Sequence, residues 1–118
     1  MNNNVIEHDW GTEIIWSNHK DYGAKLLLFQ KKIKKTNFIM NKTSAKSYFV
    51  NQGKFCFRWI DTKDGKIYQQ EVSEGGVFDS ECLKPLSIEC ITESGSISEA
   101  HSGYTQDDVL TVIRKENF

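Results

Sequence analysis

The sequence predicts an all-β domain, either an antiparallel sandwich or a barrel, and three observations support that prediction. No long window has apolar residues recurring at the helical spacing of about 3.6. β-branched and aromatic residues are frequent, and they gather in short runs. Turn residues separate these runs at fairly even spacing, which is typical of sandwiches and barrels.

The expected strands follow these runs along the chain. The clearest pair is 54–60 and 67–72, with Asp64-Gly65 between them. Asp-Gly at such a place indicates a hairpin with a type I′ turn, because that turn needs positive φ at both central residues. Gly75-Gly76 marks the next break, and Pro85, the single proline, stands just before a strand, where its missing N–H costs little. The other expected strands are 13–16, 25–32, 38–40, 47–50, 77–78, 87–92, 97–101 and 109–114.

Composition and charge exclude several classes of protein. The chain has 118 residues, which suits one domain, and 38% of them are apolar and 26% charged. A net charge of −1 gives no general attraction to nucleic acid or to an anionic membrane. The longest apolar run, 26–29, is far too short to span a bilayer, and the first residues do not resemble a secretory signal. We therefore expect no nucleic-acid or membrane partner and a cytoplasmic location.

The three cysteines offer no metal site. Cys56, Cys82 and Cys90 are odd in number and form no CxxC pair. Nearby His, Asp and Glu residues do not fall at metal-ligand spacing from them. We expect free thiols.

A series of short motifs resembles a known family. Trp10-Gly11-Thr12-Glu13 with Trp16 opens the series, and KLLLF follows at 25–29. The later matches are FV at 49–50, GKF at 53–55, RWID at 58–61, Gly75, Pro85, Glu89 and Asp107-Asp108-Val109. In this order and spacing they resemble small cupins, in particular the cupin domain of type II mannose-6-phosphate isomerases. The resemblance implies a cupin double-stranded β-helix, a jelly-roll barrel over residues 10–114, preceded by an N-terminal arm, residues 1–9. It also implies a homodimer, formed through an edge strand or an N-terminal exchange.

The metal-ligand positions of that family are replaced in this chain. The first cupin motif supplies His-x-His and a Glu, which correspond to Asn41, Thr43 and Lys46, and the His of the second motif corresponds to Leu86. Asn and Thr are weak neutral ligands, Leu is none, and the charge of Lys46 repels a cation. No shift of the alignment within 38–50 changes this, because that segment contains no His, Asp or Glu. We therefore expect no metal, no cofactor and no metal-dependent isomerase activity.

The altered site predicts a binding cavity instead. If the family's ligand positions point inward, strand alternation turns one set of side chains toward the barrel interior. The predicted ligand-binding residues are Asn41, Thr43, Lys46, Tyr48, Leu86, Ile88 and Cys90. Lys46 suits a phosphate or carboxylate, and Tyr48 offers a ring face and a hydroxyl, so the set fits a small sugar-like or anionic ligand. That these side chains simply fill the barrel remains an alternative.

Two other function classes stay open. The chain could be a metal-independent sugar or nucleotide-sugar isomerase or epimerase, with His101 or Tyr48 as acid–base groups, although no His–Asp pairing is visible in the sequence. It could also be an accessory or regulatory module that acts through an exposed face. His8 and His19 are expected at the surface, and the basic run 31–35 is expected in a solvated loop. Trp16, Trp59 and Tyr68 are candidates for an aromatic patch, although a core or interface role is commoner for such residues.

Overall fold

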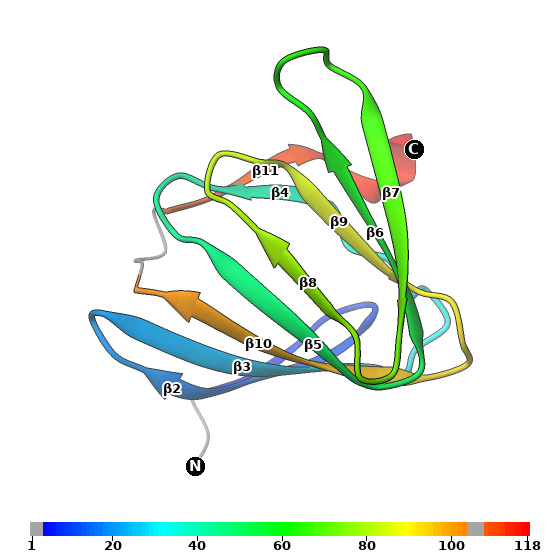
Figure 1. Ribbon diagram of the computed structural model, residues 1–118. Helices are drawn as coiled ribbons and strands as arrows, with labels where there is room; N and C mark the ends of the chain where they lie inside the picture. The colour runs from blue at the N-terminus through cyan, green and yellow to red at the C-terminus, as the bar shows by residue number, and fades with distance from the viewer. Residues whose placement is uncertain (1–3, 104–107) are drawn as a thin grey trace.

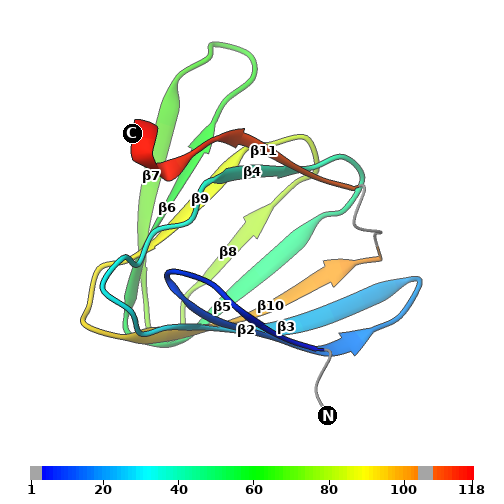
Figure 2. The same cartoon turned by 180° about the vertical axis from the view of Figure 1, so that it is seen from behind.

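The computed structural model describes residues 4–103 and 108–118, and it consists of two antiparallel sheets that face each other (Figures 1 and 2). The six-stranded sheet has the order β1 (Val5–Glu7), β2 (Gly11–Asn18), β3 (Tyr22–Phe29), β10 (Gly95–Ser102), β5 (Lys46–Gln52) and β8 (Val77–Ser80). The five-stranded sheet has the order β11 (Val109–Ile113), β4 (Phe38–Asn41), β9 (Leu86–Cys90), β6 (Lys54–Ile60) and β7 (Ile67–Ser73). A 3₁₀ turn, η2 (Lys115–Asn117), follows β11. This architecture confirms the predicted all-β jelly-roll fold.

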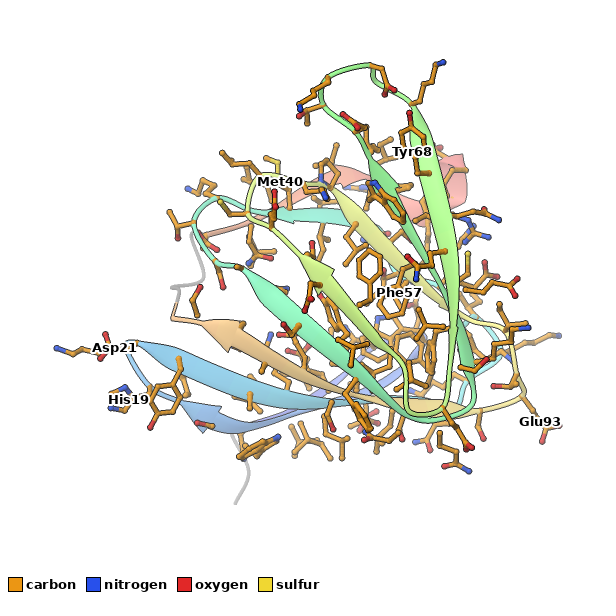
Figure 3. The ribbon with its side chains drawn as sticks, viewed as in Figure 1. His19, Asp21, Met40, Phe57, Tyr68 and Glu93 are labelled. Carbon is orange, nitrogen blue, oxygen red and sulfur yellow. The ribbon has the colours of Figure 1, made fainter. Side chains whose placement is uncertain are left out.

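The core lies between the two sheets, and strand alternation builds it. In β5, Tyr48 and Val50 are buried while Ser47 and Phe49 are exposed, because successive side chains of a strand point to opposite faces. Phe57, from the facing sheet, lies in the middle of the molecule (Figure 3). The core cluster comprises Trp10, Leu27, Phe29, Tyr48, Val50, Phe55, Phe57, Val72, Phe78, Leu86, Ile88, Cys90 and Ile97.

The β6–β7 hairpin, the tall green hairpin of Figure 1, forms as predicted, but its turn differs. Gly65 has a φ of 71°, whereas Asp64 does not have positive φ, so the type I′ prediction is wrong. The loop is wider, and it closes with the N–H of Asp61 donating to the carbonyl of Lys66 at 2.9 Å. The Asp64 carboxylate accepts the N–H of Lys66 at 2.8 Å, and this side-chain bond stabilises the longer loop.

Some boundaries differ from the predicted ones. β3 ends at Phe29, so the expected strand 25–32 is too long, and the basic run lies in an irregular segment, as expected. Within that segment the Lys34 ammonium donates to the carbonyls of Thr92 and Glu93, at 2.7 and 3.2 Å, which ties it to the β9–β10 connection.

The N-terminal segment, expected as an arm, contains a strand. Val5–Glu7 forms β1 and pairs with β2. Residues 1–3 of the expected arm and Asp107 of the matched motif lie outside the described residues. Over the described ranges no helix is long and apolar enough to cross a membrane.

Candidate functional site

A cavity of about 680 Å³ lies between the two sheets at one end of the barrel. A smaller space of about 80 Å³ lies next to it, deeper in the barrel. Four residues line both spaces, namely Glu13, Lys25, Ile39 and Lys46. The two spaces therefore form one candidate site, and three of the four shared lining residues are charged.

The register of the six-stranded sheet explains why charged side chains share one wall. Glu99 on β10 lies between Lys25 of β3 and Tyr48 of β5 in one cross-strand row. Two residues further along β10, His101 pairs with Gly23 and Lys46. Because alternate residues of a strand face the same side, both rows point into the barrel. Together with Glu13 of β2, these side chains form the charged wall of the cavity: Glu13, Lys25, Lys46, Glu99 and His101.

Glu99 is the centre of one ionic cluster. Its Oε2 lies 2.8 Å from Nδ1 of His101, and its Oε1 lies 3.9 Å from Nζ of Lys46. All three side chains are less than a tenth exposed. Burial alone would raise the pKa of the Glu99 carboxyl, but the charge of Lys46 and the hydrogen bond to His101 outweigh it and lower that pKa. Burial also lowers the pKa of Lys46, and the charge of Glu99 offsets only part of that effect.

Glu13 is the centre of a second cluster. Its Oε1 lies 2.7 Å from Nε2 of His8, and its Oε2 lies 2.8 Å from Nζ of Lys25. Burial opposes ionisation of Glu13, but the hydrogen bond to His8 and the charge of Lys25 lower its pKa to about 2. The ring of His8 also stacks on Trp10, with centroids 4.5 Å apart. His8 is thus partly buried and paired, contrary to the expectation of a surface histidine, whereas His19 is exposed, as expected.

The opposite wall of the cavity is largely apolar. The five-stranded sheet contributes Ile39, Leu86, Ile88 and Val109 to the lining. Leu86 and Ile88 therefore face the barrel interior, as the sequence predicts. Cys90 is buried but is not part of this lining, and its Sγ lies 3.4 Å from the carbonyl oxygen of Thr92.

Tyr48 lies where the charged wall meets the core. Its side chain is almost fully buried, and its ring centroid lies 5.5 Å from that of Phe57. Tyr48 lines the deeper space but not the larger one. The phenol is therefore placed to contact only a ligand that reaches deep into the barrel.

Asn41 and Thr43 do not line the cavity but bind Asp108. The amide nitrogen of Asn41 donates to Oδ2 of Asp108 at 3.0 Å, and the hydroxyl of Thr43 donates to Oδ1 at 2.6 Å. The backbone N–H of Thr43 donates to the same Oδ1 at 2.7 Å. Burial raises the pKa of Asp108, but these hydrogen bonds outweigh it and lower that pKa. The two predicted mouth residues thus stabilise the β4–β5 connection, and we leave them out of the proposed ligand contacts.

The residues at the four expected metal positions do not fit a divalent cation. Asn41 and Thr43 are engaged by Asp108, Leu86 is apolar, and the Lys46 ammonium points into the cavity wall. An ammonium at this place opposes a metal ion. Elsewhere in residues 4–103 and 108–118, no three His, Cys, Asp or Glu side chains come together as a metal site.

Sequence reasoning missed both carboxylates of the site. Glu99 and His101 stand two apart on one strand, and this spacing places both on the same face, so the pairing could have been found. Of the cations in the matched motifs, Lys25 lines the cavity, whereas Arg58 pairs with Glu89 at 2.7 Å and takes no part in the cavity lining.

The three candidate aromatic residues do not form one patch. Trp59 and Tyr68 lie 6.0 Å apart, centroid to centroid, on the β6–β7 hairpin of the five-stranded sheet. Trp16 lies on β2 of the six-stranded sheet. The prediction of a shared patch is wrong because the two groups belong to different sheets.

Comparison with known proteins identifies the fold. No protein-family model and no curated protein sequence matches the chain. Among solved structures, CapF with the inhibitor 3-isopropenyl-tropolone has a TM-score of 0.81 at 15% identity, covering 92% of this chain and 33% of its own. The capsular polysaccharide assembling protein CapF from Staphylococcus aureus has a TM-score of 0.79 at 16% identity, covering 92% and 32%. Oxalate decarboxylase from Bacillus subtilis at pH 4.6 has a TM-score of 0.75 at 11% identity, covering 95% and 32%.

These similarities show a cupin fold and nothing finer. The chain spans about a third of the length of these proteins. The resemblance to mannose-6-phosphate isomerases is therefore supported at the level of the fold. The cupin double-stranded β-helix expected from the motifs is confirmed.

Proposed function

We propose that the barrel cavity binds a small anionic, sugar-like ligand and does so without a metal. The observation that carries the proposal is the placement of Lys25 and Lys46 on one charged wall, opposite an apolar wall. A cavity of about 680 Å³ with few polar groups facing apolar side chains is typical of small-molecule sites. The similarity to CapF, a capsular polysaccharide assembling protein, supports a carbohydrate-related ligand.

Each part of such a ligand has a matching group in the cavity. The ammonium groups of Lys25 and Lys46 attract a phosphate or carboxylate. The carboxylates of Glu13 and Glu99 accept hydrogen bonds from sugar hydroxyls. The apolar side chains of the five-stranded sheet pack against the C–H face of a sugar ring. Ile39 and Val109 make that contact in the larger space, and Leu86 and Ile88, from the predicted set, make it only where the ligand reaches the deeper space.

Calorimetry and thermal-shift measurements test the proposal with hexose phosphates, sugar acids, nucleotide sugars and neutral hexoses. We expect the anionic members to bind and Lys46→Met to weaken their binding by at least about 10-fold, since one charged hydrogen bond is lost. Lys54→Met is the matched control. It removes a lysine on the barrel exterior, whose ammonium lies 3.0 Å from the carboxylate of Glu71, and it should leave ligand binding unchanged. If no anionic ligand binds the wild type, or if Lys46→Met binds as the wild type does, the proposal is wrong.

A second candidate function, a metal-independent isomerase or epimerase, is favoured by the His101–Glu99 pair. A carboxylate at 2.8 Å from Nδ1 orients the imidazole, as a general base requires. Tyr48 adds a hydroxyl deeper in the same cavity. The test is incorporation of solvent deuterium into a bound sugar, which His101→Gln and Glu99→Gln should both abolish, with Tyr48→Phe as a probe of the acid. If a sugar binds but takes up no deuterium, the isomerase or epimerase candidate is wrong and only the ligand-binding function remains.

A cytoplasmic location and the absence of nucleic-acid and membrane partners stay predictions. The accessory-module alternative requires an exposed face with a partner, and the outer surface of the six-stranded sheet is the relevant candidate.

A further inference from the structure

The six-stranded sheet has its charges on the inside. Its four central strands, β2, β3, β10 and β5, carry four carboxylate or ammonium side chains, Glu13, Lys25, Lys46 and Glu99, and all four point into the barrel. The outer face of these strands, meaning the side chains that point away from the barrel, has no charged residue, although 26% of the chain is charged. A solvated sheet face normally shows the opposite pattern, with polar and charged residues outward.

An apolar row crosses this outer face from one edge to the other. The strand register aligns Val5, Ile14, Leu26, Ser98, Phe49 and Val77 as successive neighbours on six strands. Five of these six residues are apolar, and Phe49 and Val77 are 44% and 54% exposed. Beside the row, Trp16 is 66% exposed. A contiguous exposed apolar patch of this kind marks an interaction site.

No element of the described chain covers the outer face. Every described strand belongs to one of the two sheets, and η2 lies against the other sheet, where the N–H of Lys115 donates to the Asn37 side chain at 2.9 Å. In Figure 1 β2 and β3 lie at the lower side of the molecule, and the five-stranded sheet lies above them, on the inner side. The apolar row is therefore available to a partner.

Charge and size favour a second copy of the same face as that partner. Charged residues of the outer face occur only on the edge strands, as Glu7 on β1 and Asp79 on β8. An uncharged face offers a charged partner no ion pairs, but it meets its own copy without repulsion. With strands about 4.8 Å apart and three to eight residues long, the face measures roughly 600 Å² in projection, comparable with the ~800 Å² per partner of a standard interface.

We propose that the outer face of the six-stranded sheet is a homodimer interface, in which two copies pack sheet on sheet about a two-fold axis. Such packing makes the interface self-complementary, and each copy buries the apolar row of the other. Phe49 and Trp16 are the anchors, since exposed aromatic residues dominate interface energetics. This arrangement differs from the edge-strand pairing or N-terminal exchange that the resemblance implies.

Sedimentation of the full chain between about 1 and 200 µM tests the interface. The wild type should sediment as a dimer, with twice the chain mass of 13.6 kDa. Phe49→Lys should raise the dimer dissociation constant at least about 30-fold. Ser98→Lys places a charge in the middle of the row with little change to packing and should raise the dissociation constant in the same way. It replaces Phe49→Lys in the test if that variant fails to fold. Ile67→Lys is the matched control, because Ile67 is 51% exposed on β7 of the other sheet, and it should leave the constant unchanged.

Three results would overturn the proposal. The first is a wild type that remains monomeric at the highest concentration. The second is a dimer that persists in folded Phe49→Lys or Ser98→Lys, with folding checked by circular dichroism. The third is a dimer lost on deletion of residues 1–7 but retained in Phe49→Lys, which would show an N-terminal exchange instead.

Discussion

Nδ1 of His101 lies 2.8 Å from Oε2 of Glu99, two residues earlier on the same strand. The other carboxylate oxygen of Glu99 lies 3.9 Å from the ammonium of Lys46. One buried carboxylate thus serves both an imidazole and an ammonium, which makes Glu99 the central residue of the candidate site.

Glu99→Gln should destabilise the fold by about 2–4 kcal/mol. The change leaves the buried Lys46 ammonium without the carboxylate that lies 3.9 Å from it, and breaking a buried pair by removing one partner is costly. Denaturant unfolding measures the loss. Glu71→Gln is the control, since it breaks the exposed pair with Lys54 and should cost less than about 1 kcal/mol. Equal losses in the two variants would contradict the central role of Glu99, and adding Lys46→Met to Glu99→Gln should recover part of the stability.

The lowered pKa of Glu13 predicts that the protein loses stability in acid. Its folded pKa of about 2 lies below the ordinary value of 4.5, so its stabilising contribution is fully present above pH 4.5 and disappears as the pH falls toward 2. The contribution is of the order of 2 kcal/mol once solvent screening is allowed for. Unfolding free energies measured between pH 6 and pH 2 should show this decline, and Glu13→Gln should make the curve flatter. An unchanged slope in Glu13→Gln would contradict the assignment.

Asp108→Asn should loosen the connection between β4 and β5. The amide that replaces the carboxylate accepts fewer hydrogen bonds, and Thr43 loses a charged acceptor at 2.6 Å. We expect a cost of about 1–3 kcal/mol and faster hydrogen exchange at the Thr43 amide. Asp61, whose carboxylate accepts the N–H of Lys63 at 2.8 Å in a solvent-exposed hydrogen bond, supplies the control Asp61→Asn. Unchanged exchange at Thr43 would show that Asp108 does not hold this connection.

Gly23→Ala should displace the imidazole of His101. A Cβ on Gly23 would lie 2.4 Å from Nε2 of His101 and 3.0 Å from the carbonyl oxygen of Ser17. The imidazole must then swing away from Glu99, at a cost of about 1–3 kcal/mol. Thermal unfolding measures the cost. In the double variant Gly23→Ala/His101→Ala the new Cβ no longer meets an imidazole. The losses of stability of the two single variants should therefore not add up in the double variant. Simple additivity would contradict the close approach of His101 to Gly23.

Chelation should leave the protein unchanged. The side chains at the four metal-ligand positions do not suit a divalent cation, so elemental analysis of purified protein should show no stoichiometric transition metal. The melting temperature should be the same before and after treatment with EDTA. One zinc, iron or manganese ion per chain would disprove the metal-free proposal.

Much of the fold could be predicted because strand signals are local. Alternation in 54–60 and the Asp-Gly step indicated the β6–β7 hairpin, although the side chain of Asp64 selected a wider loop than a type I′ turn. Leu86 and Ile88 were correctly placed inward, because a strand has a fixed period of two. The site was predicted less well. Asn41 and Thr43 were assigned to its mouth, but their partner, Asp108, is more than sixty residues away in the sequence.

By itself, the sequence determined the all-β class, the order of the motifs and the replacement of the metal ligands, since each depends on residue types and short spacings. Only the tertiary structure decided which side of β2, β3 and β10 faces the core, whereas the resemblance had already placed Lys46 and Tyr48 of β5 inward. On β2, β3 and β10 the alternation is the same whichever face is buried, so these strands could not show that their charges point inward and their apolar row outward. The packing of the second sheet breaks that symmetry, and it places Glu13, Lys25, Lys46 and Glu99 in one cavity.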